Sequence, residues 1–367
     1  MTPDLDNFQT LFVTDTPLLD VRSPIEFAKG SLPTAINAPL MEDSEREAVG
    51  ICYQQSGQAA AVQLGHELVT GALKEARVAR WKQFAEANPH GALFCFRGGL
   101  RSEITQQWLA EAGINYPRIK GGYKSLRQWL SQKTETIIAS TSLLLVGGQT
   151  GVAKTRLLNE GNAGRPIPGS IDLEGLANHR GSAFGRRITA QPTQIAFELA
   201  VGVALVQYQT GNHRFLILED EGRLIGRVCV PDVLQAKMAH APMVLLEQSI
   251  DERIDVVIED YIVDLGERYQ QLHGEQGAQL HADKLQADLL KIRKRLGGER
   301  HQQMSEVMAR AFDQQHATGD LEGHRQWIGF LLEKYYDPMY EYQLEQRVGE
   351  VLYRGNRQSV LDWVGSR

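Results

Sequence analysis

The amino-acid sequence predicts an α/β chain in which strands and helices alternate. Apolar runs of strand length occur at residues 142–146, Phe215–Leu218 and Met243–Leu246, and stretches with helical patterns lie between them. Strands that alternate with helices are typical of a parallel sheet. From about Asp251 onward the pattern is mostly helical. The length of 367 residues is natural for two or three domains.

Composition and charge exclude several classes of protein. A hydrophobic content of 42% and a charged content of 23% are ordinary for a soluble globular chain. The first residues lack a secretory signal, and no apolar run approaches the ~20 residues of a membrane span, so we expect no membrane association. Three cysteines without zinc-ligand spacing favour the cytoplasm and predict no metal site. With a net charge of −6, any RNA site must be a local patch.

The N-terminal part reads as a small α/β domain. The segment LLDVRSPIEFAKGSLPTAINAPL predicts a buried strand at Leu18–Val21, a turn at Ser23-Pro24 and a short helix. Further along, the pattern predicts a long helix over 58–87, a strand at Ala92–Phe94, a helix with Ile104, Trp108, Leu109 and Ala112 on one face, and a strand and turn from Ile119 to Gly122. The apolar periodicity is lost near Gln132–Glu135, where we expect a domain boundary.

The segment GALFCFRGGLRS, residues 91–102, contains a cysteine at the junction of a strand and a helix. The two glycines after Cys95 permit positive φ, so that successive backbone N–H groups can converge on one point. The helix that begins near Arg101 directs its positive end to the same point, and Arg97 adds charge. Cys95 is therefore either a nucleophile beside an anion cradle or a buried core cysteine, which is the commoner role of a single cysteine. The glycines and arginines favour the cradle.

A second Gly-rich turn, GGQTGVAKT at residues 147–155, follows a buried strand and precedes a helix, which is the context of a phosphate-binding P-loop. Its backbone N–H groups would wrap a diphosphate, Lys154 would neutralise the charge, and Thr155 would bind a metal ion or a phosphate oxygen. Ala153 stands where a glycine is usual, and positive φ there would cost about 1–2 kcal/mol. The alternative is an ordinary Gly-rich turn between a strand and a helix.

Two polar segments are candidates for the surroundings of the P-loop. In FLILEDEGRLIG, a buried strand is followed by three acidic residues, Glu219, Asp220 and Glu221. They are either acids near the phosphates or ordinary acids at a strand end. SIDLEGLANHRGSAFGRR is too polar for the core and rich in groups that bind anions. Its candidates for a substrate loop, as against a solvated loop, are Asp172, Glu174, His179, Arg180, Ser182, Arg186 and Arg187.

The C-terminal helices carry an apolar stripe, a basic face and a cluster of tyrosines. The stripe recurs at helical spacing at Leu285, Leu289, Ile292 and Leu296. A basic face would lie opposite the stripe, and it either contacts an RNA backbone or is simply solvated; its residues are Lys291, Lys294 and Arg295. The four tyrosines of EKYYDPMYEYQLE would stack on unpaired bases or, as is more common, pack in the core.

The N-terminal motif and the cysteine loop together resemble the rhodanese domain, a fold that transfers sulfur or selenium through a cysteine. The resemblance implies that Asp20 and Arg22 are structural signature residues and that Cys95 handles the chalcogen. Five residues separate Cys95 from Arg101, one more than in the commonest rhodanese loop. This spacing resembles phosphatase-type loops, so it favours a phosphorus-bearing substrate over thiosulfate.

The order of a rhodanese-like domain and a P-loop domain, with the motifs DLEGLANHRGSAFG, LEDEGRLIG and YYDPMYEYQLE, closely resembles the bacterial tRNA 2-selenouridine synthase family. The resemblance implies a rhodanese-like domain at 1–134, a P-loop domain at 140–270 and a helical region at 271–367 that packs on the P-loop domain. It implies an enzyme that S-geranylates wobble 2-thiouridine in tRNA with geranyl diphosphate and then replaces the geranylated sulfur with selenium from selenophosphate. The implied partners are the tRNA and a supplier of selenophosphate.

The resemblance also implies roles for individual residues. Cys95 would be catalytic, and selenophosphate would be held by Arg97, Gly98, Gly99, Arg101 and Ser102. The diphosphate would be bound by Gly148, Gly151, Lys154, Thr155, Arg180 and Arg186. Further polar candidates are Asp172, His179, Ser182 and Asp220, and the tRNA contact would consist of Lys291, Lys294 and Arg295. We expect no tightly bound cofactor, although Mg²⁺ is compatible with the P-loop.

Two alternatives stay open at this point. The first is a P-loop kinase or ATPase that carries a regulatory rhodanese module; it requires ATP turnover at Lys154, and Ala153 weighs against it. The second is an RNA-binding or sulfur-carrier protein without enzymatic activity, in which Cys95 is dispensable for every activity.

Overall fold

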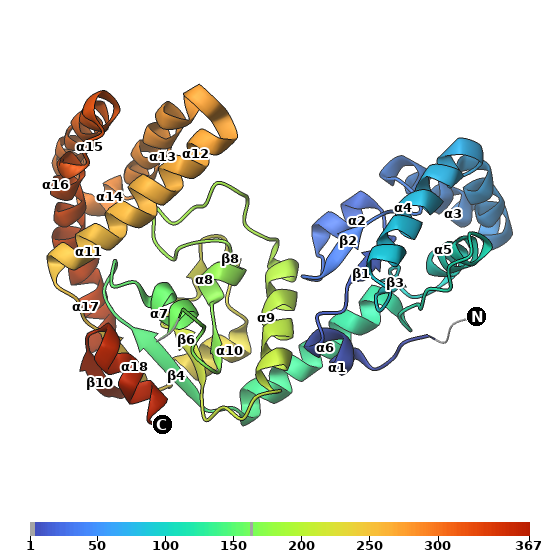
Figure 1. Cartoon of the computed structure of the whole chain (residues 1–367), viewed down its shortest axis with the longest axis horizontal. Helices are drawn as coiled ribbons and strands as arrows, with labels where there is room; N and C mark the ends of the chain where they lie inside the picture. Colours follow the sequence, from blue (N-terminus) through green and yellow to red (C-terminus); the bar gives the residue numbers. More distant parts are fainter. Residues whose placement is uncertain (1–3, 162–163) are drawn as a thin grey trace. The chain divides into compact units, whose positions relative to one another are not determined.

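The structure is a computed structural model, and it describes residues 4–161 and 164–367. The chain divides into two compact units (Figure 1). The first comprises Met1–Ala139 with Thr193–Thr210, and the second comprises Ser140–Pro192 with Gly211–Arg367. Each unit contains a parallel sheet with helices around it, which confirms the predicted α/β class.

The first unit has a three-stranded parallel sheet of order β2-β1-β3, formed by β1 (Leu18–Asp20), β2 (Ala35–Asn37) and β3 (Ala92–Phe94). Its core includes Leu19, Leu93 and Trp81. The helices of this unit are α1 (Phe8–Val13), α2 (Pro24–Lys29), α3 (Asp43–Leu68), α4 (Gly71–Ala87), α5 (Leu100–Glu111), α6 (Gly122–Ser140) and α9 (Gln194–Tyr208).

Several expected elements of this unit are confirmed, and others differ. The expected long helix is two helices, α3 and α4, and α3 is kinked at Gly57, whose φ is 80°. The strand expected at Ile119 consists only of single bridges from Leu5 to Ile119 and from Leu93 to Arg118. The loss of periodicity near residues 132–135 does not end a helix, because α6 continues to Ser140 and buries Thr134.

A buried ion pair explains the motif at the end of β1. Asp20 and Arg22 are both almost fully buried, and their carboxylate and guanidinium are 2.6 Å apart. Arg22 also donates a hydrogen bond to the carbonyl of Gly30, and its guanidinium lies 3.7 Å from the ring centroid of Tyr123. The pair therefore joins β1 to the end of α2 and to α6.

The second unit has a five-stranded parallel sheet of order β10-β9-β4-β6-β5. The strands are β4 (Leu143–Gly147), β5 (Ser170–Ile171), β6 (Leu216–Glu219), β9 (Met243–Leu246) and β10 (Val351–Gly355). The predicted strands near 143, 216 and 243 are thus confirmed. The connecting elements are α7 (Lys154–Glu160), α8 (Leu173–Leu176), α10 (Asp232–Met238), a hairpin of β7 (Leu224–Ile225) and β8 (Val228–Cys229), and α18 (Arg357–Gly365).

Residues 250–345, between β9 and β10, form a helical layer of the second unit (Figure 1). Its elements are α11 (Ile250–Val257), a π-helix at Ile258–Asp264, α12 (Leu265–His273), a 3₁₀ turn at Gly274–Gln276, α13 (Gly277–Lys291), α14 (Arg293–Leu296), α15 (Gly298–Thr318), α16 (Glu322–Leu331), a second π-helix at Leu332–Tyr336 and α17 (Asp337–Glu345). The predicted apolar stripe from Leu285 to Leu296 is buried in the core of this layer. Among the described residues, no helix is both long enough and apolar enough to cross a membrane.

Candidate functional site

The P-loop follows β4 in the middle of the five-stranded sheet and leads into α7. Gly148 and Gly151 have φ of 147° and 89°. A Cβ on Gly148 would lie 2.6 Å from the carbonyl oxygen of Leu246, and one on Gly151 would lie 3.0 Å from that of Arg253. Both positions therefore require glycine. Ala153 adopts the left-handed conformation at φ 60° and ψ 43°, so the strain foreseen at this position is present.

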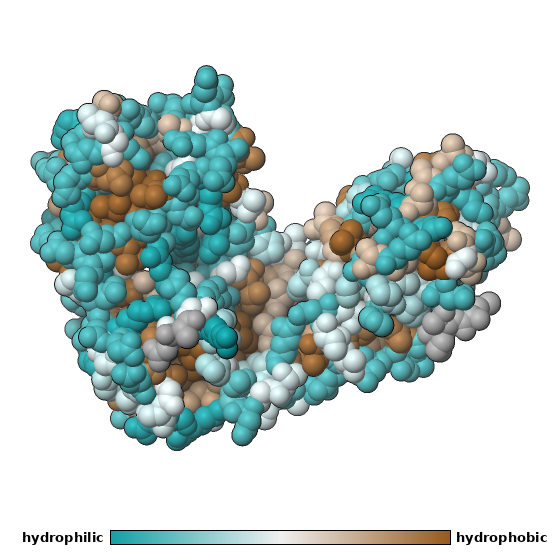
Figure 2. Space-filling model, in the orientation of Figure 1, coloured by the Kyte–Doolittle hydropathy of each residue, from teal (hydrophilic) through white to brown (hydrophobic). Residues whose placement is uncertain are grey.

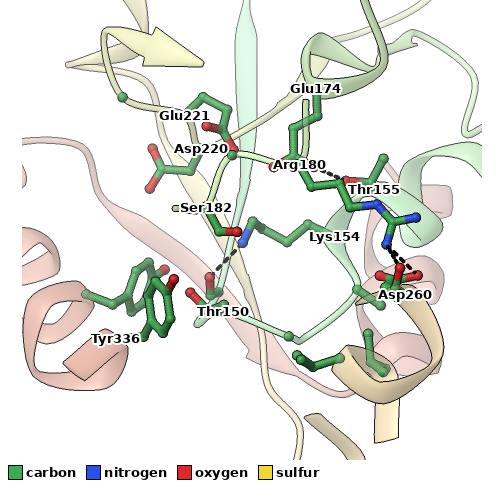
Figure 3. A pocket seen from close by; sticks show the side chains of 18 of the residues that line it. Thr150, Lys154, Thr155, Glu174, Arg180, Ser182, Asp220, Glu221, Asp260 and Tyr336 are labelled. Carbon is green, nitrogen blue, oxygen red and sulfur yellow. Dashed lines mark hydrogen bonds and ion pairs between the residues drawn. The ribbon is translucent and has the colours of Figure 1, made fainter. Parts of the chain in front are cut away.

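Lys154 and Thr155 begin α7 and line a cavity of about 990 Å³. The ammonium of Lys154 donates a 2.9 Å hydrogen bond to the carbonyl of Gly148. The hydroxyl of Thr155 donates a 2.7 Å hydrogen bond to Oε2 of Glu174 (Figure 3). The structure thus brings the four predicted P-loop residues, Gly148, Gly151, Lys154 and Thr155, to one cavity.

Arg253 holds the P-loop in place from α11. Its side chain is 3% exposed, and its Nε donates a 2.9 Å hydrogen bond to the carbonyl of Thr150. Its Nη1 donates to the side chain of Gln149, and Asp337 accepts from both Nη atoms at 2.5 and 3.0 Å. The aspartate of the YYDPMYEYQLE segment therefore orients the arginine that supports the phosphate-binding turn.

Two carboxyl groups converge beside Thr155. Glu174 and Glu221 both lie against Gly181, where a Cβ would collide with each carboxylate. Burial, followed by the neighbouring Glu174 carboxylate, raises the pKa of Glu221 to about 8. Burial also raises the pKa of Glu174, although Lys154 and the bond from Thr155 oppose the shift. Glu174 raises the pKa of Glu221, whereas the hydrogen bond from Glu221 lowers the pKa of Glu174, so Glu221 holds the proton that the pair shares near neutral pH.

The arginines around the cavity divide into paired and unpaired groups. Arg180 points toward Asp260 (Figure 3) and donates a 2.8 Å hydrogen bond to its carbonyl. It also donates a 2.8 Å hydrogen bond to the carboxylate of Asp264. Arg187 and Arg295 also line the cavity, and within the described chain neither forms an ion pair. The structure places the predicted Arg186 elsewhere. It does not line this cavity, and it lies 3.4 Å from the buried carboxylate of Asp288.

An apolar pouch opens beside the P-loop. It is bordered by Thr150 and Ser182 on the side of the cavity and is otherwise apolar, with a wall formed by Phe184, Val257, Trp327, Ile328, Leu331 and Leu332. Tyr261 and Tyr336 contribute to both spaces, and each comes from a π-helix, an element that is frequent at functional sites. The hydroxyl groups of Tyr261 and Ser182 are 3.0 Å apart. The pouch itself has a volume of only about 30 Å³, so it adds an apolar wall beside the phosphate-binding turn but little space.

The remaining polar candidates take different positions. Ser182 and Asp220 line the cavity, and Asp220 forms a 2.5 Å ion pair with Arg347. Asp172 does not line it; instead it caps α8 by accepting a hydrogen bond from the N–H of Gly175. His179 is buried outside the cavity lining, and burial, followed by the charge of Lys284, lowers its pKa to about 4. It is therefore neutral at physiological pH.

The predicted basic face is divided by a break in the helix. α13 ends at Lys291 and α14 begins at Arg293, with Ile292 at ψ −1° between them, so the three residues do not share one continuous helix. Lys291 is tied to Asp288 by a 2.6 Å ion pair. Lys294 is exposed, and Arg295 lines the P-loop cavity.

The cysteine loop connects β3 to α5 in the first unit. Cys95 is 3% exposed, and its Sγ lies 3.3 Å from the hydroxyl of Ser102 and 3.8 Å from the carbonyl of Gly99. Gly98 has φ of 66°, and a Cβ on it would lie 2.8 Å from the backbone nitrogen of Gly121. The Gly121-Gly122 turn therefore packs directly behind the loop. The thiol is buried, but it has polar neighbours.

The two arginines of this loop differ in their partners. Arg101 donates a 2.5 Å hydrogen bond to Glu26 of α2. Although burial raises the pKa of Glu26, the bonds and charge of Arg101 hold it below its usual value. Arg97 is exposed, and it forms no ion pair within the described chain. Arg97 is thus the cation of the loop that is available to an anion.

Sequence reasoning did not single out several residues of the two sites. Nothing in the local sequence connects Glu26 or Arg253 to a site, and only the fold brings them to the loops that they contact. By contrast, Glu174, Arg187 and Glu221 were named as candidates from their polar segments, and all three line the P-loop cavity, although their spacing did not distinguish them from neighbours that do not. Tyr261 carried no signal, because its position depends on a π-helix.

Comparison with known proteins gives a consistent family assignment. Residues 141–367 match the family model described as the tRNA 2-selenouridine synthase AAA domain. A protein from Marinobacter nauticus named tRNA 2-selenouridine synthase is 50% identical over 100% of this chain and 98% of its own length. Proteins of the same name from Photobacterium profundum and Pseudomonas fluorescens are 48% and 47% identical, over 98% and 100% of this chain and 97% and 99% of their own lengths.

Proposed function

Because the chain belongs to the tRNA 2-selenouridine synthase family of enzymes, we propose that it converts wobble 2-thiouridine in tRNA to 2-selenouridine in two steps. The first step is S-geranylation with geranyl diphosphate at the P-loop. The second is replacement of the geranylated sulfur by selenium from selenophosphate at the Cys95 loop, in a rhodanese-like N-terminal domain. The observation that carries the proposal is the P-loop cavity of about 990 Å³, because it combines a phosphate-binding turn with apolar lining residues such as Val257 and Met339, which suits an organic diphosphate.

In the first step the thiocarbonyl sulfur attacks C1 of the geranyl group. The S–C bond forms, the C–O bond breaks, diphosphate leaves, and the base loses its N3 proton. The N–H groups of the P-loop and the ammonium of Lys154 stabilise the charge that develops on the leaving diphosphate. Arg187 is a further cation for this anion because it is unpaired in the described chain.

The proton released from N3 needs an acceptor in the same cavity. Asp220 and Asp260 are already engaged in ion pairs with arginines. Glu174 is buried, Glu221 is half-buried, and both have raised pKa values. The ionised member of this pair is our candidate for the acceptor. Where Mg²⁺ accompanies the diphosphate, Thr155 and Glu174 offer the hard oxygen ligands that this ion takes.

In the second step selenophosphate docks in the Cys95 loop, where Arg97 and the backbone N–H groups face the anion. Selenium bonds to C2, the C2–S bond breaks, and geranylthiol leaves with a proton. Water then takes the phosphoryl group from selenium to give inorganic phosphate, which leaves C2=Se and N3–H. The buried position of Cys95 beside Ser102 is compatible with a role in orienting selenophosphate. Covalent transfer of its selenide-level selenium to the thiol would need a two-electron oxidant, which neither substrate supplies.

The tRNA contact would use local positive charge, because the chain as a whole has a net charge of −6. Lys294 is exposed on α14, and Arg295 next to it lines the P-loop cavity. A phosphate of the anticodon loop held by these residues would bring the wobble base to the first reaction site. Lys291 is a weaker candidate, since Asp288 neutralises it.

The proposal is tested with the purified full-length chain, an anticodon stem-loop RNA that contains 2-thiouridine, and nucleoside mass spectrometry. With geranyl diphosphate alone we expect S-geranyl-2-thiouridine, and with selenophosphate added we expect 2-selenouridine. Both reactions should proceed without ATP. If the chain instead required and hydrolysed ATP, or formed no geranylated nucleoside, the first step would be assigned incorrectly.

A further inference from the structure

The first unit contains a cavity of about 820 Å³ to which the two proposed reactions assign no ligand. It extends from the cysteine loop to α3, and all of its lining residues belong to this unit. Arg97, Leu100 and Arg101 form its boundary at the loop. Val62 of α3 and Ile104 and Trp108 of α5 form part of its apolar wall. The loop that carries Cys95 is therefore one end of a largely apolar space.

Exposed apolar side chains gather around this cavity. Ile51 and Tyr53 of α3 are 48% and 57% exposed, and Leu100 at the start of α5 is 42% exposed. Figure 2 shows apolar atoms exposed among polar ones on the surface of the first unit. Exposed apolar residues that are scattered singly are normal on a protein surface. When they gather around a concave space, they indicate a site for a ligand or partner.

The charged residues that line this cavity are Arg97 and Arg101 of the loop and Arg46 and Glu47 of α3. Arg97 is unpaired in the described chain, whereas Arg101 and Arg46 both face Glu26, at 2.5 and 3.4 Å. The loop thus supplies an unpaired cation, and much of the wall from α3 and α5 is apolar. This distribution fits a substrate that places its reacting group at the loop and an apolar chain against α3 and α5.

We propose that this cavity binds the geranyl chain of S-geranyl-2-thiouridine while selenium replaces sulfur at the Cys95 loop. The inference rests on the proposed two-step function and adds a binding site to its second step. Ten carbon atoms at roughly the 30 Å³ of a water molecule need about 300 Å³, so the cavity has room for the chain and part of the base. The bound geranyl group holds C2 of the base at the loop, and after the exchange it leaves the same space as geranylthiol.

The test compares two double variants of the full-length chain that are matched in exposure. Ile51→Ser/Leu100→Ser removes apolar groups from the cavity. Ile25→Ser/Leu73→Ser removes side chains that are also 48% and 42% exposed but do not line it. Each protein receives selenophosphate with stem-loop RNAs that carry either S-geranyl- or S-methyl-2-thiouridine. We expect the cavity variant to lose about tenfold in rate on the S-geranyl RNA only, and the control to lose nothing.

A binding measurement separates this inference from the proposed function. The S-geranyl-2-thiouridine nucleoside is titrated into each variant, and its affinity for the cavity variant should fall about tenfold. If wild type binds the nucleoside in this way but forms no 2-selenouridine, the second step fails and the binding site stands. If wild type turns over but both variants behave alike, the site is refuted. A wild-type dimer that only the cavity variant dissociates would also refute it, since the apolar surface would then bind a second copy.

Discussion

The hydroxyl of Thr155 donates a 2.7 Å hydrogen bond to Oε2 of Glu174, which links the first turn of α7 to α8. This bond fixes one of two carboxyl groups directly beside the P-loop. The other, Glu221, lies with it against Gly181. A pair of carboxyl groups that shares a proton next to a phosphate-binding lysine is a costly arrangement, and such arrangements concentrate at functional sites. It also makes the stability of the second unit depend on pH.

Glu221→Gln should change the pH dependence of stability. The pKa of Glu221 is raised from 4.5 to about 8 in the folded chain. The contribution of this carboxyl group to the stability of the folded chain is therefore fully present below pH 4.5 and is lost as pH rises through 8. The free energy of unfolding of the variant, relative to that of wild type, should therefore rise by on the order of 2–4 kcal/mol between pH 5 and pH 9. Urea unfolding at both pH values measures the gain, and exposed Glu299→Gln should show none.

Lys154→Ala should lower the rate of S-geranylation by about 100-fold, because it removes the side-chain cation that stabilises the departing diphosphate. Selenium transfer to RNA that already carries S-geranyl-2-thiouridine should be unchanged. Nucleoside mass spectrometry follows both reactions. Lys82→Ala is the control, since this lysine lies on α4 in the other unit. An unchanged geranylation rate in Lys154→Ala would show that the P-loop does not bind the diphosphate.

Ala153→Gly should stabilise the chain by about 0.5–1 kcal/mol. The substitution removes the left-handed strain of an alanine at φ 60°, and the gain is partly offset by the larger entropy of glycine in the unfolded chain. Denaturant unfolding gives the difference. Ala287→Gly on the exposed side of α13 is the matched control, and it should destabilise by a similar amount. Destabilisation by Ala153→Gly would mean that the alanine methyl group makes packing contacts worth more than the strain.

Local sequence predicted the parts of the fold that depend on neighbouring residues. An apolar run followed by GGQTGVAKT defined β4, the P-loop and α7, and Ala153 was recognised as strained from its place in the motif. Contacts between distant segments were not predictable in this way. Glu26 is 75 positions from its partner Arg101, and Arg253 is 103 positions from Thr150.

Apolar composition also left two placements undetermined. The apolar residues of α9, such as Phe197 and Val201, predict that the helix is buried, but they do not predict which unit it packs against. The structure assigns α9 to the first unit, although its sequence lies between strands of the second. Similarly, the spacing of Lys291, Lys294 and Arg295 predicted one helix face, and the break at Ile292 could not be foreseen because no glycine or proline marks it.

Lys294→Ala should weaken tRNA binding equally for all tRNAs, because a contact to a phosphate carries no sequence information. The slope of log affinity against log salt concentration should fall by about 1. Filter binding or fluorescence anisotropy over a range of salt concentrations measures it. Lys334→Ala, another exposed lysine of the same unit, is the control. If both variants lower the slope equally, the contact is a diffuse property of the surface rather than a site at α14.

Cys95→Ala should abolish formation of 2-selenouridine and leave S-geranylation intact, so that S-geranyl-2-thiouridine accumulates in the RNA. The physical reason is that the thiol belongs to a loop of the first unit, whereas the P-loop cavity is lined only by residues of the second. Cys52→Ala tests for a general effect of removing a thiol from the first unit, and it should leave both products unchanged. Because Cys95 lies in the core of its unit, thermal unfolding must first show that the variant is folded. A folded Cys95→Ala variant that still incorporates selenium at the wild-type rate would exclude a chemical role for the thiol and leave the loop only as an anion-binding element.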